Sequence, residues 1–115
     1  MESREPHITR YQRWLGEHRG LSFDSYDALW RWSVSDLSAF WASIWDFFGI
    51  ASPTPHACVL REPVMPGATW FPGAQLNYVQ HLFGHAEASH AAGHPAIVFS
   101  DEALLARGKL REVSW

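Results

Sequence analysis

The stretch SDLSAFWASIWDFFG, Ser35–Gly49, is the clearest helix in the sequence and carries its largest apolar face. Ser35 is expected to cap the helix N-terminus, and Gly49 to end the helix in the left-handed conformation. At about 100° per residue the bulky side chains fall within an arc of roughly 160°, and they are Leu37, Phe40, Trp41, Ile44, Trp45, Phe47 and Phe48. The remaining positions, which form the polar side, are Asp36, Ser38, Ala39, Ala42, Ser43 and Asp46. So broad a face is expected to pack against something larger than one short helix.

Two shorter helices are expected before this one. Apolar and aromatic side chains recur at helical spacing from Pro6 to Gly20, where the glycine would end the helix. Ser25 is a good N-cap for a second helix that runs through Trp32. After the long helix comes a Pro-rich break, and Ala57–Leu60 is then expected to be a short extended segment.

Two Pro-Gly pairs flank a Trp-Phe dipeptide in the stretch MPGATWFPGAQLNY, Met65–Tyr78. The pairs predict turns that direct Trp70 and Phe71 inward. Gly73 is expected to give room where the next helix begins. We therefore interpret the stretch as a docking corner.

The end of the sequence combines a helix with a β-hairpin. The helix is expected to start at Leu76 and to fade into a loop over EASHAAGH, Glu87–His94. Ala96–Phe99 and Leu110–Val113 then predict two antiparallel strands joined by a polar connection. An isolated two-stranded hairpin is at best marginally stable in water, so this one is expected to need a larger sheet. The predicted fold class is α+β, a mainly helical N-terminal part followed by a C-terminal hairpin.

The composition limits what the chain can do. Its 115 residues suffice for one core, yet they include seven Trp, seven Phe and three Tyr, more large rings than such a core can cover. The net charge of -3 and the lack of a basic cluster argue against binding to nucleic acid or to a membrane surface. A single cysteine and no apolar run approaching about 20 residues predict a reducing, cytoplasmic setting without a membrane span.

Histidines are the first residues that could carry chemistry. His81 and His85 lie four apart on the expected helix, and His90 and His94 repeat that spacing, which would suit zinc in a small hydrolase. Only Glu87 offers a carboxylate in a fixed relation to them, so solvent-facing histidines are the favoured interpretation.

The cysteine and the aromatic pairs each allow two interpretations. Cys58 lies near His56, but neighbours on an extended segment point apart, so a buried structural cysteine is favoured over a reactive thiolate. The aromatic pairs are Trp30 with Trp32 and Trp70 with Phe71. They could be stacking platforms for sugars or bases, but they lack polar donors to orient a ligand, so packing in a core or an interface is favoured. Because the sequence has no phosphate-binding glycine loop and no nucleophile motif, we expect no catalytic, cofactor-binding or metal-binding residue in it.

Three motifs follow one another along the chain: L-W-x-W-S, then F-W on the next helix, then W-F-x-G-x-x-L-N. Their residues are Leu29, Trp30, Trp32, Ser33, Phe40, Trp41, Trp70, Phe71, Gly73, Leu76 and Asn77. In this order they resemble the N-terminal region of acetoacetate-CoA ligases, which belong with the acetyl-CoA synthetases in the adenylate-forming, AMP-producing superfamily. Two less specific stretches, Trp45–Gly49 and Met65–Ala68, favour a resemblance to ligases for acetoacetate over those for acetate or propionate.

The resemblance implies a full-length enzyme that works in two steps. ATP and the carboxylate form an acyl-adenylate with loss of pyrophosphate, and the CoA thiol then displaces AMP. ATP, Mg²⁺ and CoA are therefore expected for the full-length family, and none of them is expected to bind this chain, which should be inactive alone.

The resemblance also implies how the chain is divided. Residues 1–94 would form the N-terminal helical cap, and residues 95–115 the first hairpin of a larger α/β AMP-binding domain, cut before the nucleotide and CoA sites. The expected partner is then the remainder of the ligase chain, packed on the aromatic face of Ser35–Gly49, with no nucleic acid and no membrane.

Two other functions stay open. The chain could be the N-terminal region of an acetyl- or propionyl-CoA synthetase, or a stand-alone aromatic-rich module that binds a partner protein.

Overall fold

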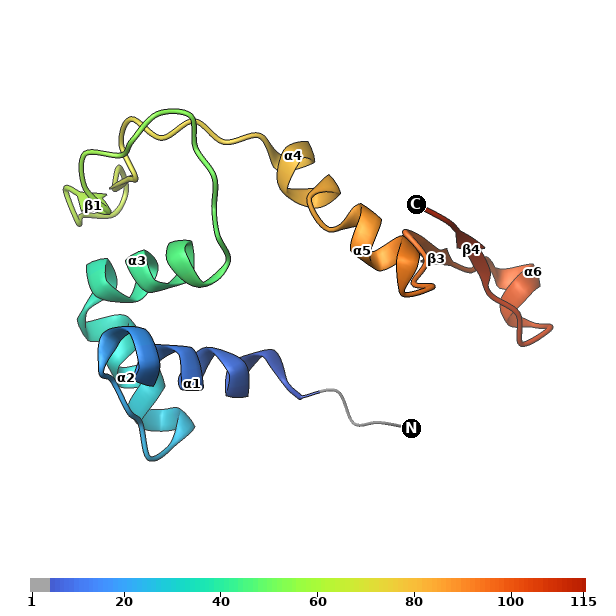
Figure 1. Ribbon diagram of the computed structural model, residues 1–115, viewed down its shortest axis with the longest axis horizontal. Coiled ribbons are helices and arrows are strands. Elements are labelled where there is room, and N and C mark those ends of the chain that lie inside the picture. The colour runs from blue at the N-terminus through green and yellow to red at the C-terminus, as the bar shows by residue number, and fades with distance from the viewer. Residues whose placement is uncertain (1–4) are drawn as a thin grey trace. The chain divides into compact units, whose positions relative to one another are not determined.

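The computed structural model describes residues 5–115, in which helices are joined by short strands and turns (Figure 1). The elements, in order, are α1 (His7–Arg19), α2 (Tyr26–Ser35), α3 (Leu37–Phe47), β1 (Leu60–Arg61), β2 (Thr69–Trp70), α4 (Tyr78–Phe83), α5 (Ala86–Ala91), β3 (Ile97–Phe99), α6 (Glu102–Leu105) and β4 (Arg111–Val113). Residues 5–115 are thus mainly helical with a C-terminal hairpin, as predicted, and they contain a second short antiparallel strand pair, β1–β2.

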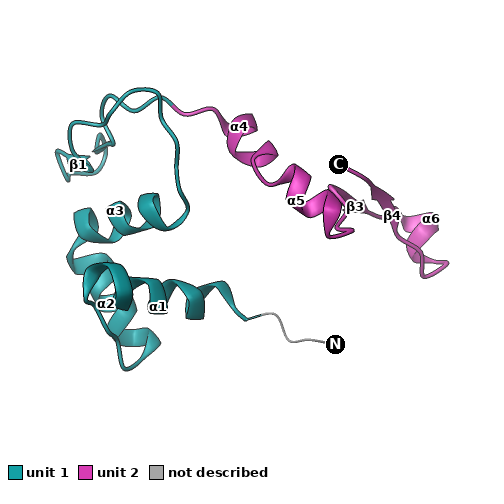
Figure 2. Ribbon diagram, in the orientation of Figure 1, with its two compact units in different colours: residues 1–75 teal, residues 76–115 magenta. Residues whose placement is uncertain are grey.

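The chain forms two compact units, residues 1–75 and residues 76–115 (Figure 2). The first contains α1 to α3 and the β1–β2 pair, and the second contains the remaining elements. The boundary predicted between residues 94 and 95 concerns the domains of a full-length ligase, and it stays a prediction.

Helix α1 confirms the expectation for Pro6–Gly20. Gly20 ends it in the left-handed conformation with φ 64°, and the N–H of Leu21 donates to the carbonyl of Leu15 across that turn. Leu15 is fully buried, which stabilises the fold by about 1.5–3 kcal/mol relative to an exposed side chain.

The junction between α2 and α3 differs from the expectation for Ser35. Ser35 is the last residue of α2, and its hydroxyl donates to the carbonyl of Trp32. The N-cap of α3 is Asp36, whose carboxylate accepts a hydrogen bond of 3.0 Å from the N–H of Ala39. Aspartate caps a helix as well as serine does, so α2 can extend further than predicted. Gly49 has φ 61°, as expected for the turn that follows the helix.

The core of the first unit lies where α1 and α2 pack against α3. Its buried apolar residues are Tyr11, Leu15 and Leu29, and the partly buried ones around them are Trp14, Leu21, Phe23, Trp32, Phe40, Ile44 and Phe47. The rings of Tyr11 and Phe47 meet edge to face at 5.1 Å between centroids, a favourable geometry for aromatic pairs.

Ser43 contradicts the polar side predicted for α3, because it is fully buried. Its hydroxyl lies 2.6 Å from the hydroxyl of Tyr11 and donates to the carbonyl of Phe40 at 2.6 Å. A small side chain allows α1 to approach α3 at this point, and the hydrogen bonds remove the cost of burying its hydroxyl.

The expected extended segment Ala57–Leu60 is one side of a hairpin that was not predicted. Leu60 is paired with Trp70 in the β1–β2 register. The antiparallel course continues past the strands, since the N–H of Phe71 donates to the carbonyl of Val59 at 2.8 Å. Two-residue strands leave no alternating pattern for sequence analysis to detect.

The second unit confirms the predicted hairpin and corrects the predicted loop. Strands β3 and β4 are antiparallel, with Ile97 opposite Val113. Helix α4 begins at Tyr78 rather than at Leu76, because Asn77 caps it by accepting from the N–H groups of the next turn. The expected loop over Glu87–His94 is mostly the helix α5, in which alanines of high helix propensity outweigh the polar residues. Within residues 5–115, none of the helices has the length and apolar character needed to cross a membrane.

Candidate docking surface

The apolar face of α3 is covered on two flanks rather than by a single neighbour. Phe40, Ile44 and Phe47 pack on the core formed with α1 and α2. Trp41 and Trp45 lie on the other flank, against the segment that follows α3. The face is therefore divided between two contacts within the same unit, which accounts for its breadth.

The corner at residues 65–78 reaches α3 through stacked rings. The ring of Phe71 stacks on that of Trp45 at 4.7 Å, and His56 meets both rings edge to face. Phe71 has φ 44°, a left-handed backbone that costs a non-glycine residue about 1–3 kcal/mol. Phe71 thus points inward as predicted, whereas Trp70 contacts Trp41 edge to face and stays 41% exposed.

Gly73 was expected to give room where the next helix begins. The structure shows instead that the corner itself requires this glycine. Its φ of 95° suits glycine, and a Cβ atom there would lie 3.0 Å from the carbonyl oxygen of Pro55. The hydroxyl of Thr54 also donates to the carbonyl of Gly73 at 2.6 Å. Gly73 therefore joins the corner to the Pro-rich segment at Thr54 and Pro55 by a close backbone approach.

The family motif residues fall into separate places. Leu29, Trp32 and Phe40 belong to the core, and Trp41, Trp70, Phe71 and Gly73 belong to the corner. Leu76 and Asn77 lie in the second unit, where Asn77 caps α4 and Leu76 is exposed. Trp30 is in neither cluster: its side chain is 51% exposed, and its carbonyl accepts a hydrogen bond from the Ser33 hydroxyl.

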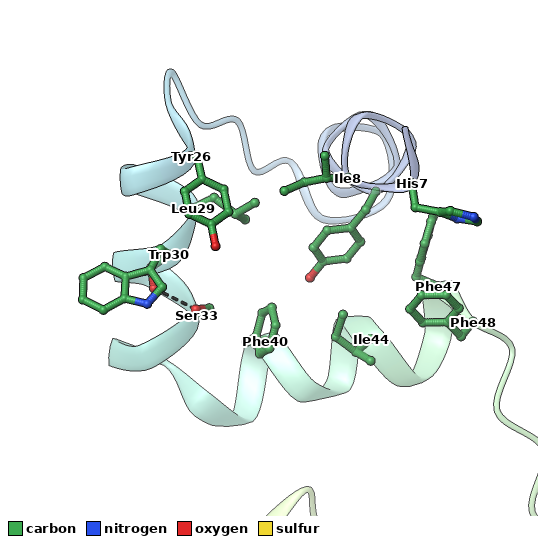
Figure 3. Close-up of a pocket in the computed structure, with 11 residues that line it drawn as sticks. His7, Ile8, Tyr26, Leu29, Trp30, Ser33, Phe40, Ile44, Phe47 and Phe48 are labelled. Carbon is green, nitrogen blue, oxygen red and sulfur yellow. Dashed lines mark hydrogen bonds between the residues drawn. The ribbon is translucent and has the colours of Figure 1, made fainter. Parts of the chain in front are cut away.

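Trp30 instead lines an apolar groove formed by α1, α2 and α3 (Figure 3). The groove has a volume of about 290 Å³, and its lining residues are His7, Ile8, Tyr11, Tyr26, Leu29, Trp30, Ser33, Phe40, Ile44, Phe47 and Phe48. Sequence reasoning missed it, because these side chains come from three helices whose packing no single periodic pattern reveals.

Two of the polar side chains that line the groove are engaged in hydrogen bonds already. The Tyr11 hydroxyl is bonded to Ser43, and the Ser33 hydroxyl donates to the carbonyl of Trp30 at 2.7 Å. Burial raises the pKa of Tyr11 above its ordinary value of 10.0, and the hydrogen bond with Ser43 partly offsets the rise. No Lys, Arg, Asp or Glu from residues 5–115 lines the groove, so it lacks the cluster of basic side chains that typically holds a triphosphate or the diphosphate of CoA.

The paired histidines do not form a metal centre. His81 is hydrogen-bonded through Nδ1 to the carbonyl of Asn77 at 2.9 Å, while His85, His90 and His94 are exposed. Over residues 5–115, no group of three His, Cys, Asp or Glu side chains could hold a metal ion. The described residues therefore do not fit Mg²⁺ or zinc.

Comparison with known proteins identifies the family to which this architecture is similar. Residues 26–82 match the family described as acetyl-coenzyme A synthetase N-terminus. The chain is 34% identical over 87 residues to an acetoacetyl-CoA synthetase of Macaca fascicularis, a match that covers 74% of this chain and 13% of that protein. It is 36% identical over 69 residues to an acetoacetyl-coenzyme A synthetase of Rhizobium meliloti, over 60% of this chain and 11% of that protein.

A solved structure gives the same result for the fold. The acetoacetyl-CoA synthetase of Streptomyces lividans matches with a TM-score of 0.79 and 39% identity, over 96% of this chain and 16% of that one. The helices and the corner therefore form an N-terminal region of the acyl-CoA synthetase class. The chain belongs to the acetyl-CoA synthetase N-terminus family, and within it the chain matches acetoacetyl-CoA synthetases.

Proposed function

We propose that this chain is the N-terminal structural region of an AMP-forming ligase that joins acetoacetate to CoA at the expense of ATP. The observation that carries the proposal is the likeness to the Streptomyces lividans acetoacetyl-CoA synthetase, which extends over 96% of this chain at 39% identity. The macaque and Rhizobium relatives, which carry the same name, support acetoacetate over acetate or propionate.

In this proposal the chemistry takes place in the remainder of the ligase. The full-length protein would bind ATP and Mg²⁺ for adenylate formation, in which a cation and phosphate-binding donors stabilise the triphosphate charge, and it would bind CoA for the displacement of AMP. No Lys or Arg from residues 5–115 lines the apolar groove, and its Tyr11 and Ser33 hydroxyls are engaged in hydrogen bonds within the unit. The described residues thus stabilise the enzyme rather than touch its substrates.

The isolated chain tests the proposed lack of a nucleotide site. A ligand that binds only the folded state raises the midpoint of thermal unfolding, and the rise grows with the ratio of the ligand concentration to its Kd. We expect millimolar ATP with Mg²⁺, or CoA, to leave the midpoint of the 115-residue chain unchanged in differential scanning fluorimetry. A midpoint that rises steadily with ATP would overturn the structural role.

A chimeric enzyme tests the structural role directly. The matching N-terminal region of the Streptomyces lividans synthetase would be replaced by this chain, and acetoacetyl-CoA formation would be measured beside the parent enzyme. We expect a folded chimera with activity on acetoacetate, whereas the parent lacking that region should lose stability. An inactive chimera whose large domain is otherwise intact would count against the proposal.

A second candidate function is a stand-alone interaction module, and the exposure of Tyr26 and Trp30 favours it. This function requires the chain to be well folded alone, with a single cooperative thermal transition. Binding of a hydrophobic dye together with loss of near-UV circular dichroism would contradict it and support a structural region that needs its parent enzyme.

A further inference from the structure

The apolar groove of the first unit has no role in the fold described so far. We propose that it receives apolar side chains from the remainder of the ligase, so that Tyr26 and Trp30 anchor the N-terminal region to the larger protein. The inference rests on the proposed function and narrows it: the anchoring surface is the groove of α1, α2 and α3, which includes part of the aromatic face of α3 but not Trp41 or Trp45.

The rim of the groove is apolar and open to solvent. Tyr26 is 67% exposed, Trp30 51% and Phe48 55%, and Ile8 stands on the α1 side of the same hollow (Figure 3). Tyr26 and Trp30 are four residues apart on α2, which puts their side chains on one face of the helix. Both line the same groove and are exposed, and exposed apolar surface around a groove is typical of an interaction site.

Outside the groove, the α3 face has little left to offer a partner. Phe40, Ile44 and Phe47 are partly buried against the core and line the groove, and Trp45 is stacked on Phe71. On the flank away from the groove, the exposed ring of Trp41 is already engaged edge to face with Trp70. The groove is therefore the larger unoccupied apolar surface of the first unit.

The chemistry of the lining identifies an apolar polypeptide as the occupant. The hydroxyls of Tyr11 and Ser33 are bonded within the unit, and no Lys, Arg, Asp or Glu of residues 5–115 lines the groove. Its volume of about 290 Å³ falls at the lower limit of pockets that hold drug-sized ligands, about 300–1,000 Å³. Inserted aliphatic or aromatic side chains fit such a hollow, whereas a nucleotide would leave its phosphates unpaired.

The remainder of the ligase is the occupant that the comparisons favour. This chain spans 16% of the Streptomyces lividans synthetase and 13% of the macaque protein, so most of such an enzyme is available to cover the groove. Tyrosine and tryptophan are frequent anchors where one protein surface packs on another, because they bury large area with few rotatable bonds.

Cysteine labelling in the chimeric enzyme tests the inference. Tyr26→Cys and Trp30→Cys would be introduced one at a time, in a Cys58→Ser background, into the isolated chain and into the chimera. The matched control is Val64→Cys, which lies outside the groove in the loop between β1 and β2 and replaces a side chain that is 62% exposed. Alkylation by iodoacetamide would be followed at each peptide by mass spectrometry.

We expect the groove thiols to react at least about tenfold more slowly in the chimera than in the isolated chain, since a docked surface reacts only on local opening. The control thiol should react at similar rates in both. Equal rates at all three positions in an active chimera would overturn the groove as anchor while leaving the proposed function standing. Protection that appears in the isolated chain and grows with its concentration would instead assign the groove to a second copy, and would also overturn the proposal.

Discussion

The buried pair of hydroxyls between α1 and α3 sets a direction for each hydrogen bond. Ser43 has one hydroxyl proton and donates it to the carbonyl of Phe40, so Tyr11 must donate to Ser43. The two hydroxyls therefore depend on each other unequally for their hydrogen bonds. Ser43 keeps its donor bond without Tyr11, whereas the Tyr11 hydroxyl loses its acceptor without Ser43.

This asymmetry predicts unequal costs for two small substitutions. Ser43→Ala leaves a buried donor unsatisfied and should lower the free energy of unfolding by about 1–3 kcal/mol, while Tyr11→Phe should cost about 1 kcal/mol. The double variant should be more stable than the sum of the two losses implies, because no donor is left to satisfy. Urea unfolding of the four proteins measures the cycle. Strictly additive losses would show that the two hydroxyls do not interact.

The same tyrosine predicts how stability depends on alkaline pH. Burial raises the pKa of Tyr11 in the folded chain above the 10.0 of an unfolded one, so the unfolded state releases its proton first. The contribution of the protonated tyrosine is fully present below pH 10 and is lost as pH rises through the folded pKa. Urea midpoints between pH 8 and 11 should fall more steeply for the parent chain than for Tyr11→Phe. Replacement of the exposed Tyr78 by phenylalanine is the control, and it should keep the parent's pH profile.

At single positions the sequence predicted the direction of a side chain better than it predicted which distant residues would cover that side chain. The inward direction of Phe71 followed from the turns that flank it, and the structure confirms it. The burial of Ser43 did not follow, because a serine on the polar side of a helical pattern gives no sign that another helix crosses there. Trp30 was expected to pack in a core or in an interface, and the structure leaves it outside the core, where it lines an open groove.

Among the elements, the corner at residues 65–78 contains two glycines with the same backbone requirement and different surroundings. Gly67 has φ 108° with open space where a Cβ would be, whereas at Gly73, with φ 95°, a Cβ would approach the Pro55 carbonyl to 3.0 Å. Gly67→Ala should therefore cost about 1–2 kcal/mol from the left-handed backbone alone. Gly73→Ala should cost more and should release the corner from α3. Fluorescence of the stacked Trp45 and the thermal midpoint would report both effects, and equal losses would contradict the close approach.

Elements with a local signal were predictable, and elements that depend on distant partners were not. Helices α1 and α2 and the turn after α3 followed from caps and periodicity, because these interactions lie within a few residues. The β1–β2 pair depends on residues eight or ten apart that meet only through a hairpin with a long loop. The α5 helix was missed for another reason: its histidine and serine suggested a loop, although its alanines favour a helix.

For the molecule as a whole, the two compact units differ in how many buried side chains stabilise each of them internally. The fully or nearly buried side chains Tyr11, Leu15, Leu29 and Ser43 all lie in the first unit. Residues 76–115 contain no buried side chain, and their helices α4, α5 and α6 have six residues or fewer. Isolated helices shorter than about 12–15 residues and two-stranded hairpins are marginal in water.

Separate fragments should therefore behave differently. Residues 1–75 alone should unfold in one cooperative transition at a midpoint close to that of the 115-residue chain, because the core is complete within them. Residues 76–115 alone should show little ordered structure by circular dichroism and by amide proton dispersion in NMR spectra. In the chimeric enzyme, by contrast, the amides of β3 and β4 should become protected from hydrogen exchange, since a larger sheet would supply the neighbours that the hairpin lacks. A cooperatively folded 76–115 fragment would contradict this dependence and would make the second unit a domain in its own right.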